Sequence, residues 1–281
     1  MSGVATTGGE RSGQGAGGSV RRHRLSTRIW HWVNAATFFV MLMSGLMVFN
    51  AHPRLYWGQY GANADPAWLE IGSDGGRGYL RVGSAVVDTS GVLGTQAVDG
   101  GVQRRAFPGW ATIPGSYDLA LGRRWHLTFA WLFAGGLAAY GCRSLANGHL
   151  WRDLLPARRE LGLRHLAGEV VGHLALRFRR GEGAGYNTLQ KLAYLAVLAG
   201  LMPLMVLTGL TMSPAMDAAW PWLLDLFGGR QSARAIHFVV AALLVLFLLV
   251  HLAMVVLAGP VNEIRSMVTG WWRLSEDRAE E

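Results

Sequence analysis

The chain of 281 residues contains a single cysteine and few charged side chains. With Cys142 alone, neither an intrachain disulfide nor an iron–sulfur cluster held by several thiolates can form. The Cys-x-x-Cys-His sequence that attaches haem covalently is also absent. Charged residues make up 16% of the chain, whereas soluble domains carry about 25%. These shortages exclude a disulfide scaffold and argue against an ordinary soluble domain.

Catalytic motifs are missing as well. No phosphate-binding loop, nucleophile–base arrangement or metalloprotease sequence occurs, so any substrate chemistry is expected to belong to a partner. The net charge of +8 would suggest nucleic acid in a soluble protein. In a chain with long apolar runs, a basic excess more often reports orientation in a membrane, so no nucleic-acid partner is expected.

The chain is rich in long apolar runs. The clearest extends from Ala235 to Ala258 and contains only two polar residues, His237 and His251. Because about 20 apolar residues cross a bilayer, this run is expected to be a transmembrane helix surrounded by lipid. Pro203 lies within another run, where neighbouring helices can satisfy the carbonyl that it frees. We predict an all-α membrane protein, a bundle of four transmembrane helices at about 29–50, 124–146, 188–212 and 232–258.

The distribution of arginine predicts the orientation of these spans, because basic residues concentrate on the cytoplasmic side. Arginine is abundant before the first span, between the second and third, and after the fourth. Both termini and the connection 147–186 are therefore expected in the cytoplasm, with the spans in the bacterial inner (cytoplasmic) membrane. The near-neutral segment 51–122 is then a long outer loop, interpreted as a small folded cap or docking surface with strand-like runs such as Tyr79–Val87.

The remaining segments complete the predicted organisation. The tail 1–20 is rich in Gly and Ser and is expected to be disordered. The connection 147–186 mixes Leu, Val and Arg at roughly helical spacing, which predicts an interfacial amphipathic helix on the inner membrane surface. The transmembrane domain is expected to cover 21–272, followed by a C-terminal tail at 273–281.

Four histidines lie in or beside the predicted spans. His237 and His251 are separated by fourteen residues, which is about 21 Å of helix rise on nearly the same face. His31 begins the first span on the cytoplasmic side, and His126 begins the second span on the outer side. We therefore expect an inner pair, His31 with His251, and an outer pair, His126 with His237. A lone histidine would be explained as a packed side chain, but two pairs at two depths point to function.

Two bis-histidine pairs suit two b-type haems, because low-spin haem iron takes one imidazole on each side. Structural zinc would need four ligands around one ion at about 2 Å, which pairs at different depths do not provide. Since both axial positions are filled, such haems are expected to transfer electrons rather than to bind oxygen. Gly45 and Gly141 fall near the depths of the outer and inner pairs, where they leave room either for porphyrin or for close helix packing.

Arginines near the histidines are candidates for the haem propionates. Arg124 and Arg234 lie within one helical turn of the outer pair, and Arg28 flanks His31. Guanidinium groups pair well with carboxylates, which favours propionate binding by these three residues. The alternative is that they extend from the spans toward the membrane surface.

Several stretches resemble the prokaryotic cytochrome b family, which includes formate dehydrogenase gamma subunits, nickel–iron hydrogenase cytochromes and thiosulfate reductase cytochrome subunits. The resemblance covers about 22–50 and 117–272. It rests on Arg28-Ile-Trp-His-Trp-Val-Asn-Ala35 with Ser44-Gly-Leu46, on Tyr186-Asn-Thr-Leu-Gln-Lys191, on Arg234-Ala-Ile-His237 with His251, and on the stretch Asn262–Gly270.

The resemblance implies a di-haem membrane subunit that exchanges electrons with quinone. In similar proteins the quinone lies near the inner haem, and the matching position here is Asn187, with Gln190 and Lys191 as weaker candidates. Asn187 is alternatively the N-cap of the third span. The outer loop is longer than in the simplest family members, which indicates a different partner.

We therefore expect an electron-transfer subunit rather than a catalytic one. It would carry electrons between the quinone pool and a periplasmic redox protein, either a molybdopterin oxidoreductase or a cytochrome. Two alternatives remain: a free-standing cytochrome b that reacts with quinone, and a haem-free membrane transporter or anchor that uses its histidines for metal or protons. The direction of electron flow is left open by the sequence.

Overall fold

The computed structural model describes residues 19–148, 155–156, 158–174 and 188–273. The chain divides into two compact units, described here one at a time. The terminal unit combines Met1–Asn34 with Val250–Glu281, and the central unit is Ala35–Leu249. The helices that begin and end the bundle, α1 and α8, each contribute residues to both units.

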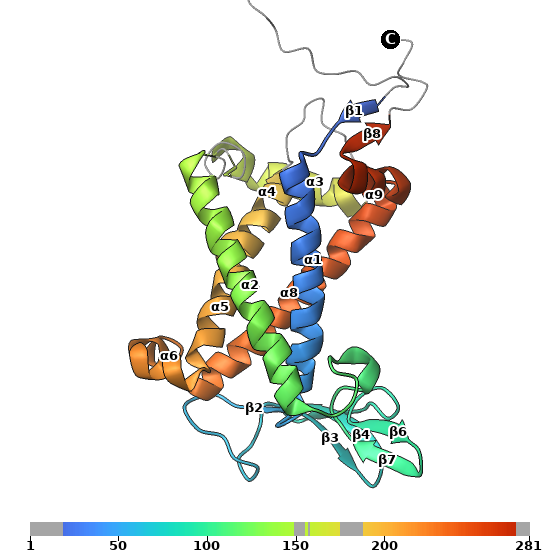
Figure 1. The fold of residues 1–281 in the computed structure, drawn as a ribbon, viewed down its shortest axis with the longest axis vertical. Coiled ribbons are helices and arrows are strands. Elements are labelled where there is room, and N and C mark those ends of the chain that lie inside the picture. Colours follow the sequence, from blue (N-terminus) through green and yellow to red (C-terminus); the bar gives the residue numbers. More distant parts are fainter. Residues whose placement is uncertain (1–18, 149–154, 157, 175–187, 274–281) are drawn as a thin grey trace, which may run out of the picture. The chain divides into compact units, whose positions relative to one another are not determined.

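Long helices dominate the described residues (Figure 1). They are α1 (Leu25–Phe49), α2 (Leu119–Ala146), the run α4–η4–α5 (Thr188–Leu195, Ala196–Leu201 and Met202–Thr211) and α8 (Arg230–Ala258). Three helices among the described residues are long and apolar enough to cross a membrane: Leu25–Phe49, Thr188–Thr211 and Arg230–Leu257. Helix α2 has 28 residues, but its His126 and its several glycines and tryptophans make it less hydrophobic than the other three.

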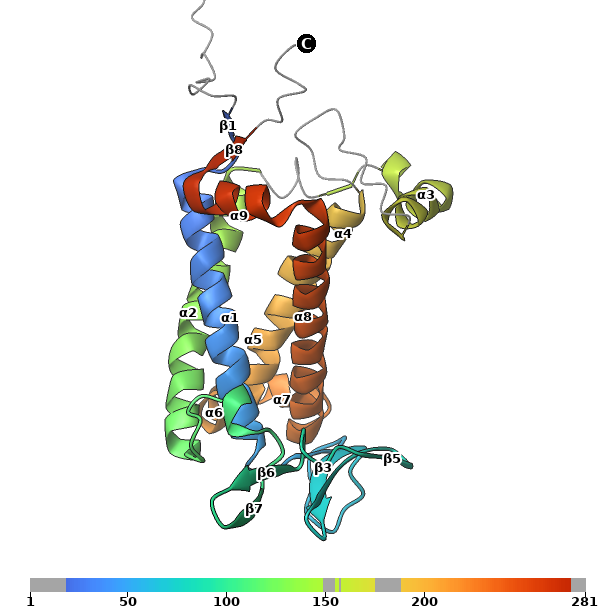
Figure 2. The ribbon, with the colours of Figure 1, turned by 90° about the vertical axis from the view of Figure 1, so that its right-hand side faces the viewer.

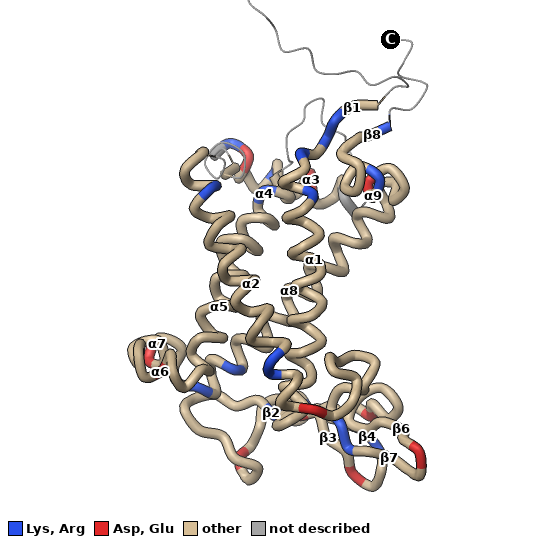
Figure 3. Tube along the Cα trace, in the orientation of Figure 1, with Lys and Arg blue, Asp and Glu red and all other residues tan. Residues whose placement is uncertain are grey.

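Charged residues are absent from the middle of the long helices. Figure 3 shows Lys, Arg, Asp and Glu at the helix ends and in the strands, whereas the middle of each long helix carries none. In α8, exposed side chains such as Leu243, Leu246 and Leu249 are themselves aliphatic. An apolar exterior of this kind suits a helix that faces lipid tails.

A π-helical turn interrupts the third long run. In η4 the backbone N–H of Met202 donates to the carbonyl of Val197, five residues earlier, instead of the usual four. Pro203 follows directly, and a proline inside a helix lacks an N–H and clashes with the preceding turn. The wider turn of η4 accommodates this proline without ending the helix. The sequence prediction that Pro203 is tolerated within a span agrees with this continuous course.

The core of the central unit joins its helices. Val197 of η4 and Val240 and Leu244 of α8 are buried against Phe38 of α1 and Met205 of α5. Helix α2 lies against α5. These contacts bring α1, α2, α5 and α8 together around the positions that carry His126 and His237.

Shorter helices connect or follow the long ones. They are η1 (Gly109–Ala111), η3 (Arg158–Leu161), α3 (Leu163–Leu174), α6 (Pro214–Ala219), α7 (Trp222–Leu226) and α9 (Pro260–Thr269). Helix α3 lies within the connection 147–186, where the sequence predicted an amphipathic helix. Within that connection, residues 149–154, 157 and 175–186 are outside the described residues.

The segment 51–122 contains two small sheets, an addition to the all-α prediction. One sheet has the order β2-β3-β4-β5, built from Arg54–Leu55, Leu69–Asp74, Arg77–Val82 and Ala85–Asp88; the other pairs β6 (Thr95–Val98) with β7 (Gly101–Arg104). In Figure 2 the strands gather beyond the end of α1 that carries Phe49. Phe49, Leu55 and Ile71 form a buried cluster with Ala235 of α8, so this cap is packed onto the bundle.

A buried carboxylate organises the larger sheet. Glu70 of β3 accepts from Arg54 at 2.7 Å, from Arg81 at 3.1 Å and from the Tyr79 hydroxyl at 2.8 Å. Burial alone would raise the pKa of Glu70, but the hydrogen bonds from Tyr79 and Arg54 and the nearby positive charges hold that pKa below its usual value. Three strands are thereby cross-linked through one side chain.

In the terminal unit the two ends of the described chain are paired. Strand β1 (Ser19–Arg21) runs antiparallel to β8 (Trp271–Arg273), with Ser19 opposite Arg273. Arg22 forms an ion pair with Glu263 of α9 at 3.2 Å, and its guanidinium lies 4.2 Å above the Trp272 ring. Strand β1 therefore begins within the last two residues of the tail predicted to be disordered; residues 1–18 and 274–281 lie outside the described residues.

Candidate functional site

The structure brings the four histidines of the predicted spans together as two pairs. In the central unit the ring centroids of His126 (α2) and His237 (α8) are 6.4 Å apart. In the terminal unit the ring centroids of His31 (α1) and His251 (α8) are also 6.4 Å apart. These pairs, called here the central pair and the terminal pair, are the ones that the sequence predicted from depth. Their role as iron ligands stays a prediction.

His126 is held by the middle of α1. Its Nδ1 lies 3.2 Å from the Ser44 hydroxyl and 3.2 Å from the carbonyl of Met41. Because a carbonyl only accepts, Nδ1 carries the proton and the unprotonated nitrogen is Nε2. A Cβ added to Gly45 would lie 3.2 Å from His126 Cε1, so the glycine makes space for the ring. Gly45 thus faces the histidine pair for which the sequence predicted it.

His237 is held by α5 in the same manner. Its Nδ1 lies 3.0 Å from the Thr208 hydroxyl, and the ring also has a hydrogen bond to the backbone of Met205. A Cβ added to Gly209 would lie 3.4 Å from His237 Cε1. Both rings of the central pair are thus oriented through Nδ1, which leaves each Nε2 as the nitrogen for a metal.

The terminal pair is held differently. Nδ1 of His31 is buried and has no hydrogen-bond partner among the described residues. Trp32 packs edge-on against the His31 ring, with centroids 5.1 Å apart. No described acceptor therefore orients the His31 ring through Nδ1, in contrast to both rings of the central pair.

The spacing of each pair fits an iron atom between two imidazoles. A metal about 2 Å from each coordinating nitrogen, with roughly 1 Å more to each ring centre, places two ring centroids about 6 Å apart. Both observed separations are 6.4 Å. The glycines beside the central pair, Gly45 and Gly209, add to this fit. The four histidines are therefore suited to hold two haem irons.

The arginines predicted to bind propionates have other partners in the structure. Arg234 donates from Nη1 to the carbonyl of Arg54 at 3.0 Å and from Nη2 to the carbonyl of His52. Arg28 donates from Nη2 to the carbonyl of Val268 in α9, and its Nε is buried without a partner. Arg124 is exposed on α2. Their role toward propionates stays a prediction.

Of the predicted quinone residues, Asn187 lies outside the described residues. Gln190 is exposed on the first turn of α4, and Lys191 forms an ion pair with Glu160 at 3.1 Å. The N-terminus of α4 is capped by Glu169, which accepts from the backbone N–H of Leu189 at 2.9 Å. Burial alone would raise the pKa of Glu169, but backbone hydrogen bonds to its carboxylate lower that pKa overall.

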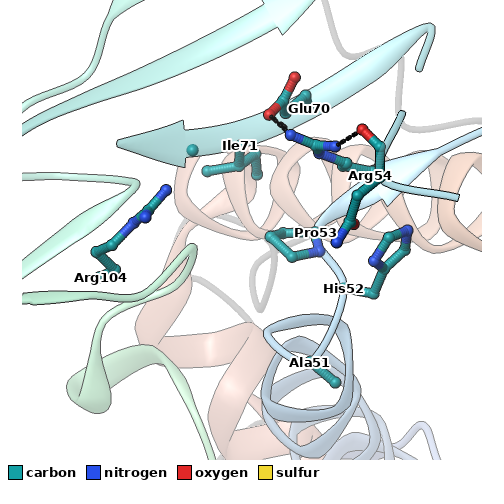
Figure 4. Close-up of a pocket in the computed structure, with 9 residues that line it drawn as sticks. Ala51, His52, Pro53, Arg54, Glu70, Ile71 and Arg104 are labelled. Carbon is teal, nitrogen blue, oxygen red and sulfur yellow. Dashed lines mark hydrogen bonds and ion pairs between the residues drawn. The ribbon is translucent and has the colours of Figure 1, made fainter. Parts of the chain in front are cut away.

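The cap contains a separate cavity of about 360 Å³ (Figure 4). Arg54 and Glu70 lie together on one side of it, and Arg104 lies on the other. His52 also lines the cavity, and burial, followed by the charges of Arg234 and Arg54, lowers its pKa. Because Glu70 is ion-paired with Arg54 and Arg104 donates to Ser73, these charges serve the cap itself.

Sequence reasoning missed two residues of the central site. Thr208 was not singled out, and Ser44 was noted only within a family resemblance. The signal that would have found both is a repeated pattern, Met-x-x-Ser-Gly-Leu at Met41–Leu46 and Met-x-x-Thr-Gly-Leu at Met205–Leu210. Each copy places a hydroxyl and a glycine next to each other in the middle of a long helix.

The chain is similar to known proteins over most of its length. Residues 22–270 match the family described as prokaryotic cytochrome b561. A relative in Azospira oryzae, named putative protein-methionine-sulfoxide reductase subunit YedZ1, is 33% identical over 134 residues. That alignment covers 48% of this chain and 64% of the relative, so it spans less than two thirds of the relative's length. No solved structure is significantly similar to the chain.

Proposed function

The chain belongs to the prokaryotic cytochrome b561 family, and from this premise we propose that it is a di-haem subunit passing electrons between quinone and an external redox partner. The family confirms the prediction of a mainly helical, multi-pass membrane protein with haem b and a role in electron transport. The number of haems, the quinone reaction, the partner and the orientation belong to the proposal.

One observation carries the proposal: two histidine pairs, each with ring centroids 6.4 Å apart. A single pair would support one haem. Two pairs that both use α8 support two, since fourteen residues separate His237 from His251 along this helix. Haem b held by these histidines would supply one-electron transfer.

The proposed topology has four spans, with α2 as the second. The pairing of Ser19 with Arg273 supports this topology, because it keeps the two ends of the described chain together on one side of a membrane. An even number of crossings has this result. The three strongly apolar helices alone would give an odd number, whereas α2, with 28 residues, makes the number four. The arginine pattern places both termini in the cytoplasm and the cap outside.

Within this arrangement, His126 and His237 would bind the outer haem through Nε2, while His31 and His251 would bind the inner one. Arg28, Arg124 and Arg234 remain the candidates for propionates, because a guanidinium has five N–H donors, more than the hydrogen bonds described for Arg28 and Arg234 use. We propose that 21–272 is the transmembrane domain and that 147–186 is its inner amphipathic connection. Asn187, Gln190 and Lys191 are the candidate quinone residues.

The cap is proposed to receive the external partner, because the buried cluster of Phe49, Leu55 and Ala235 fixes it to α8 close to His237. The name of the Azospira oryzae relative offers a methionine-sulfoxide reductase as one candidate partner. A reductase of that kind would draw electrons outward from quinol. A partner that oxidises its own substrate would send them inward.

The experiment is to purify the protein from membranes and measure haem content by the pyridine haemochrome method. Two b-type haems per chain are expected, with the reduced spectrum of bis-imidazole iron. A protein without haem would support the transporter or anchor alternative, and one haem per chain would remove one of the two proposed sites. Co-purification with a catalytic subunit separates a complex from a free-standing cytochrome.

A further inference from the structure

A hexapeptide pattern occurs twice in the central unit and meets the central histidine pair both times. Met41–Leu46 lies in α1, and Met205–Leu210 lies in α5. In each copy, the methionine backbone and the hydroxyl three residues later bond the same imidazole, and the following glycine faces the ring. Two helices from different parts of the chain thus present the same motif to the two histidines.

The direction of the hydrogen bonds is fixed by the number of protons. The Ser44 hydroxyl donates its one proton to the carbonyl of Val40 at 2.6 Å. It therefore accepts from His126 Nδ1–H, a proton that it shares with the carbonyl of Met41. The Thr208 hydroxyl likewise donates to the carbonyl of Leu204 at 2.7 Å and accepts from His237 Nδ1–H. Ser44 and Thr208 are both 0% exposed, so water does not compete for these bonds.

We propose that Ser44 and Thr208 are positioning residues that set the redox potential of the central haem. This inference rests on the proposed function, because it assumes iron at Nε2 of His126 and His237. An acceptor at Nδ1–H fixes the tautomer and raises the basicity of the ligand nitrogen. A more basic ligand favours oxidised iron, so the two hydroxyls lower the potential of the central haem.

The terminal pair provides an internal contrast. His31 Nδ1 has no acceptor among the described residues, so the same influence does not act on that histidine. The two proposed haems therefore differ in the groups behind their ligands, although the spacing of the two pairs is equal. The predicted effect of Ser44 and Thr208 is confined to one of two redox transitions, which makes it measurable within a single protein.

The test is redox titration of the purified holoprotein with Ser44→Ala, Thr208→Val and the double variant. The double variant should raise the potential of the central haem by about 59 mV, a tenfold change in its reduced-to-oxidised ratio. The other transition should stay in place. Electron paramagnetic resonance should show a changed low-spin ferric signal for the central haem alone. Thr208→Ser keeps the acceptor and should retain the original potential.

Thr211→Val is the matched control. Thr211 is also buried in α5 and its hydroxyl also donates to a carbonyl four residues earlier, that of Leu207. The Thr211→Val variant tests whether loss of any buried hydroxyl in this helix moves the potential of the central haem.

The inference is overturned if Thr208→Val leaves the potential of the central haem unchanged, or if Thr211→Val moves it equally. If the unmodified protein holds no haem, the proposed function itself fails, and this result is distinct from an unchanged potential. Should Ser44→Ala not accumulate, Thr208→Val against Thr208→Ser decides the question.

Discussion

Arg234 donates a hydrogen bond to the backbone carbonyl of His52, which joins helix α8 to the start of the cap. A second bond reaches the carbonyl of Arg54, and the guanidinium lies 5.3 Å from the centre of the Phe49 ring. Arg234 precedes His237 by three residues, which is less than one helical turn. The side chain therefore has a structural role in the cap and belongs to a residue within one helical turn of His237 in the central pair.

These two roles of Arg234 are separable by substitution. Arg234→Leu should loosen the cap by about 1–3 kcal/mol for each buried carbonyl left without a donor. It should also lower the potential of the central haem, because a nearby positive charge favours the reduced form. Arg234→Lys keeps the charge but cannot reach two carbonyls, so it should loosen the cap and preserve the potential. Redox titration and hydrogen exchange of the cap amides measure the two effects.

Arg230 serves as the control for Arg234. It lies one turn earlier on α8 and forms an ion pair with Asp217 at 2.7 Å. Arg230→Leu should leave both the cap exchange rates and the haem potentials close to their original values. If Arg234→Leu also leaves the potential unchanged, hydrogen bonding to the cap is the whole role of this arginine.

The pairing of the histidines predicts which haem each substitution removes. His126→Ala or His237→Ala should eliminate the haem of the central pair and spare most of the other. His31→Ala or His251→Ala should have the opposite effect. Redox titration with optical detection resolves the two transitions. Loss of the same transition in His31→Ala and His237→Ala would contradict the assignment of the pairs.

The quinone proposal is tested by Asn187→Ala in membranes. Re-oxidation of the haems by a quinone analogue should slow at least tenfold, while both haem spectra remain intact. Lys191→Met is the comparison, because Lys191 is already engaged with Glu160 at 3.1 Å and should matter less. Unchanged re-oxidation in Asn187→Ala, together with slowing by a substitution in the cap, would move the quinone site to the opposite side.

Glu70 predicts a pH dependence of the cap. Its pKa is lowered in the folded protein, so its stabilising effect is complete above the unfolded-state pKa of about 4.3. The effect is lost as the pH falls through the lower folded-state pKa. Glu70→Gln should therefore destabilise the cap by about 1.5–3 kcal/mol at pH 7 and by less in acid. Hydrogen exchange of β3 and β4 measures this, and an equal loss at both pH values would contradict it.

Three of the predicted spans and the proximity of the histidines within each pair could be predicted from the sequence. Long apolar runs mark helices that cross lipid, and the spacing of His237 and His251 follows from helical rise. The proximity of His31 to His251 and of His126 to His237 could be inferred from depth alone. Successive spans cross a membrane in opposite directions. The position of each histidine within its span therefore indicates its depth.

The cap and the helix-to-helix hydrogen bonds were harder to predict. The order β2-β3-β4-β5 depends on which strands pair, and the alternation of residues in 51–122 is too weak to fix register. The cross-linking of Arg54, Tyr79 and Arg81 by Glu70 appears only once that register is known. Ser44 and Thr208 looked like small polar residues tolerated in a span, since their partners lie on other helices.

The pairing of Ser19 with Arg273 has a consequence for the connectivity of the chain. Neighbouring strands are about 4.8 Å apart, so a short linker would join these two positions. The glycine turn Gly75–Gly76 between β3 and β4 has positive φ at both residues and offers a place to open the chain instead. Such a circular permutant would hold the same helices and histidine pairs while its new ends emerged from the cap. Comparison of this permutant with the natural chain would show whether the order in which the spans are synthesised affects the structure that they form.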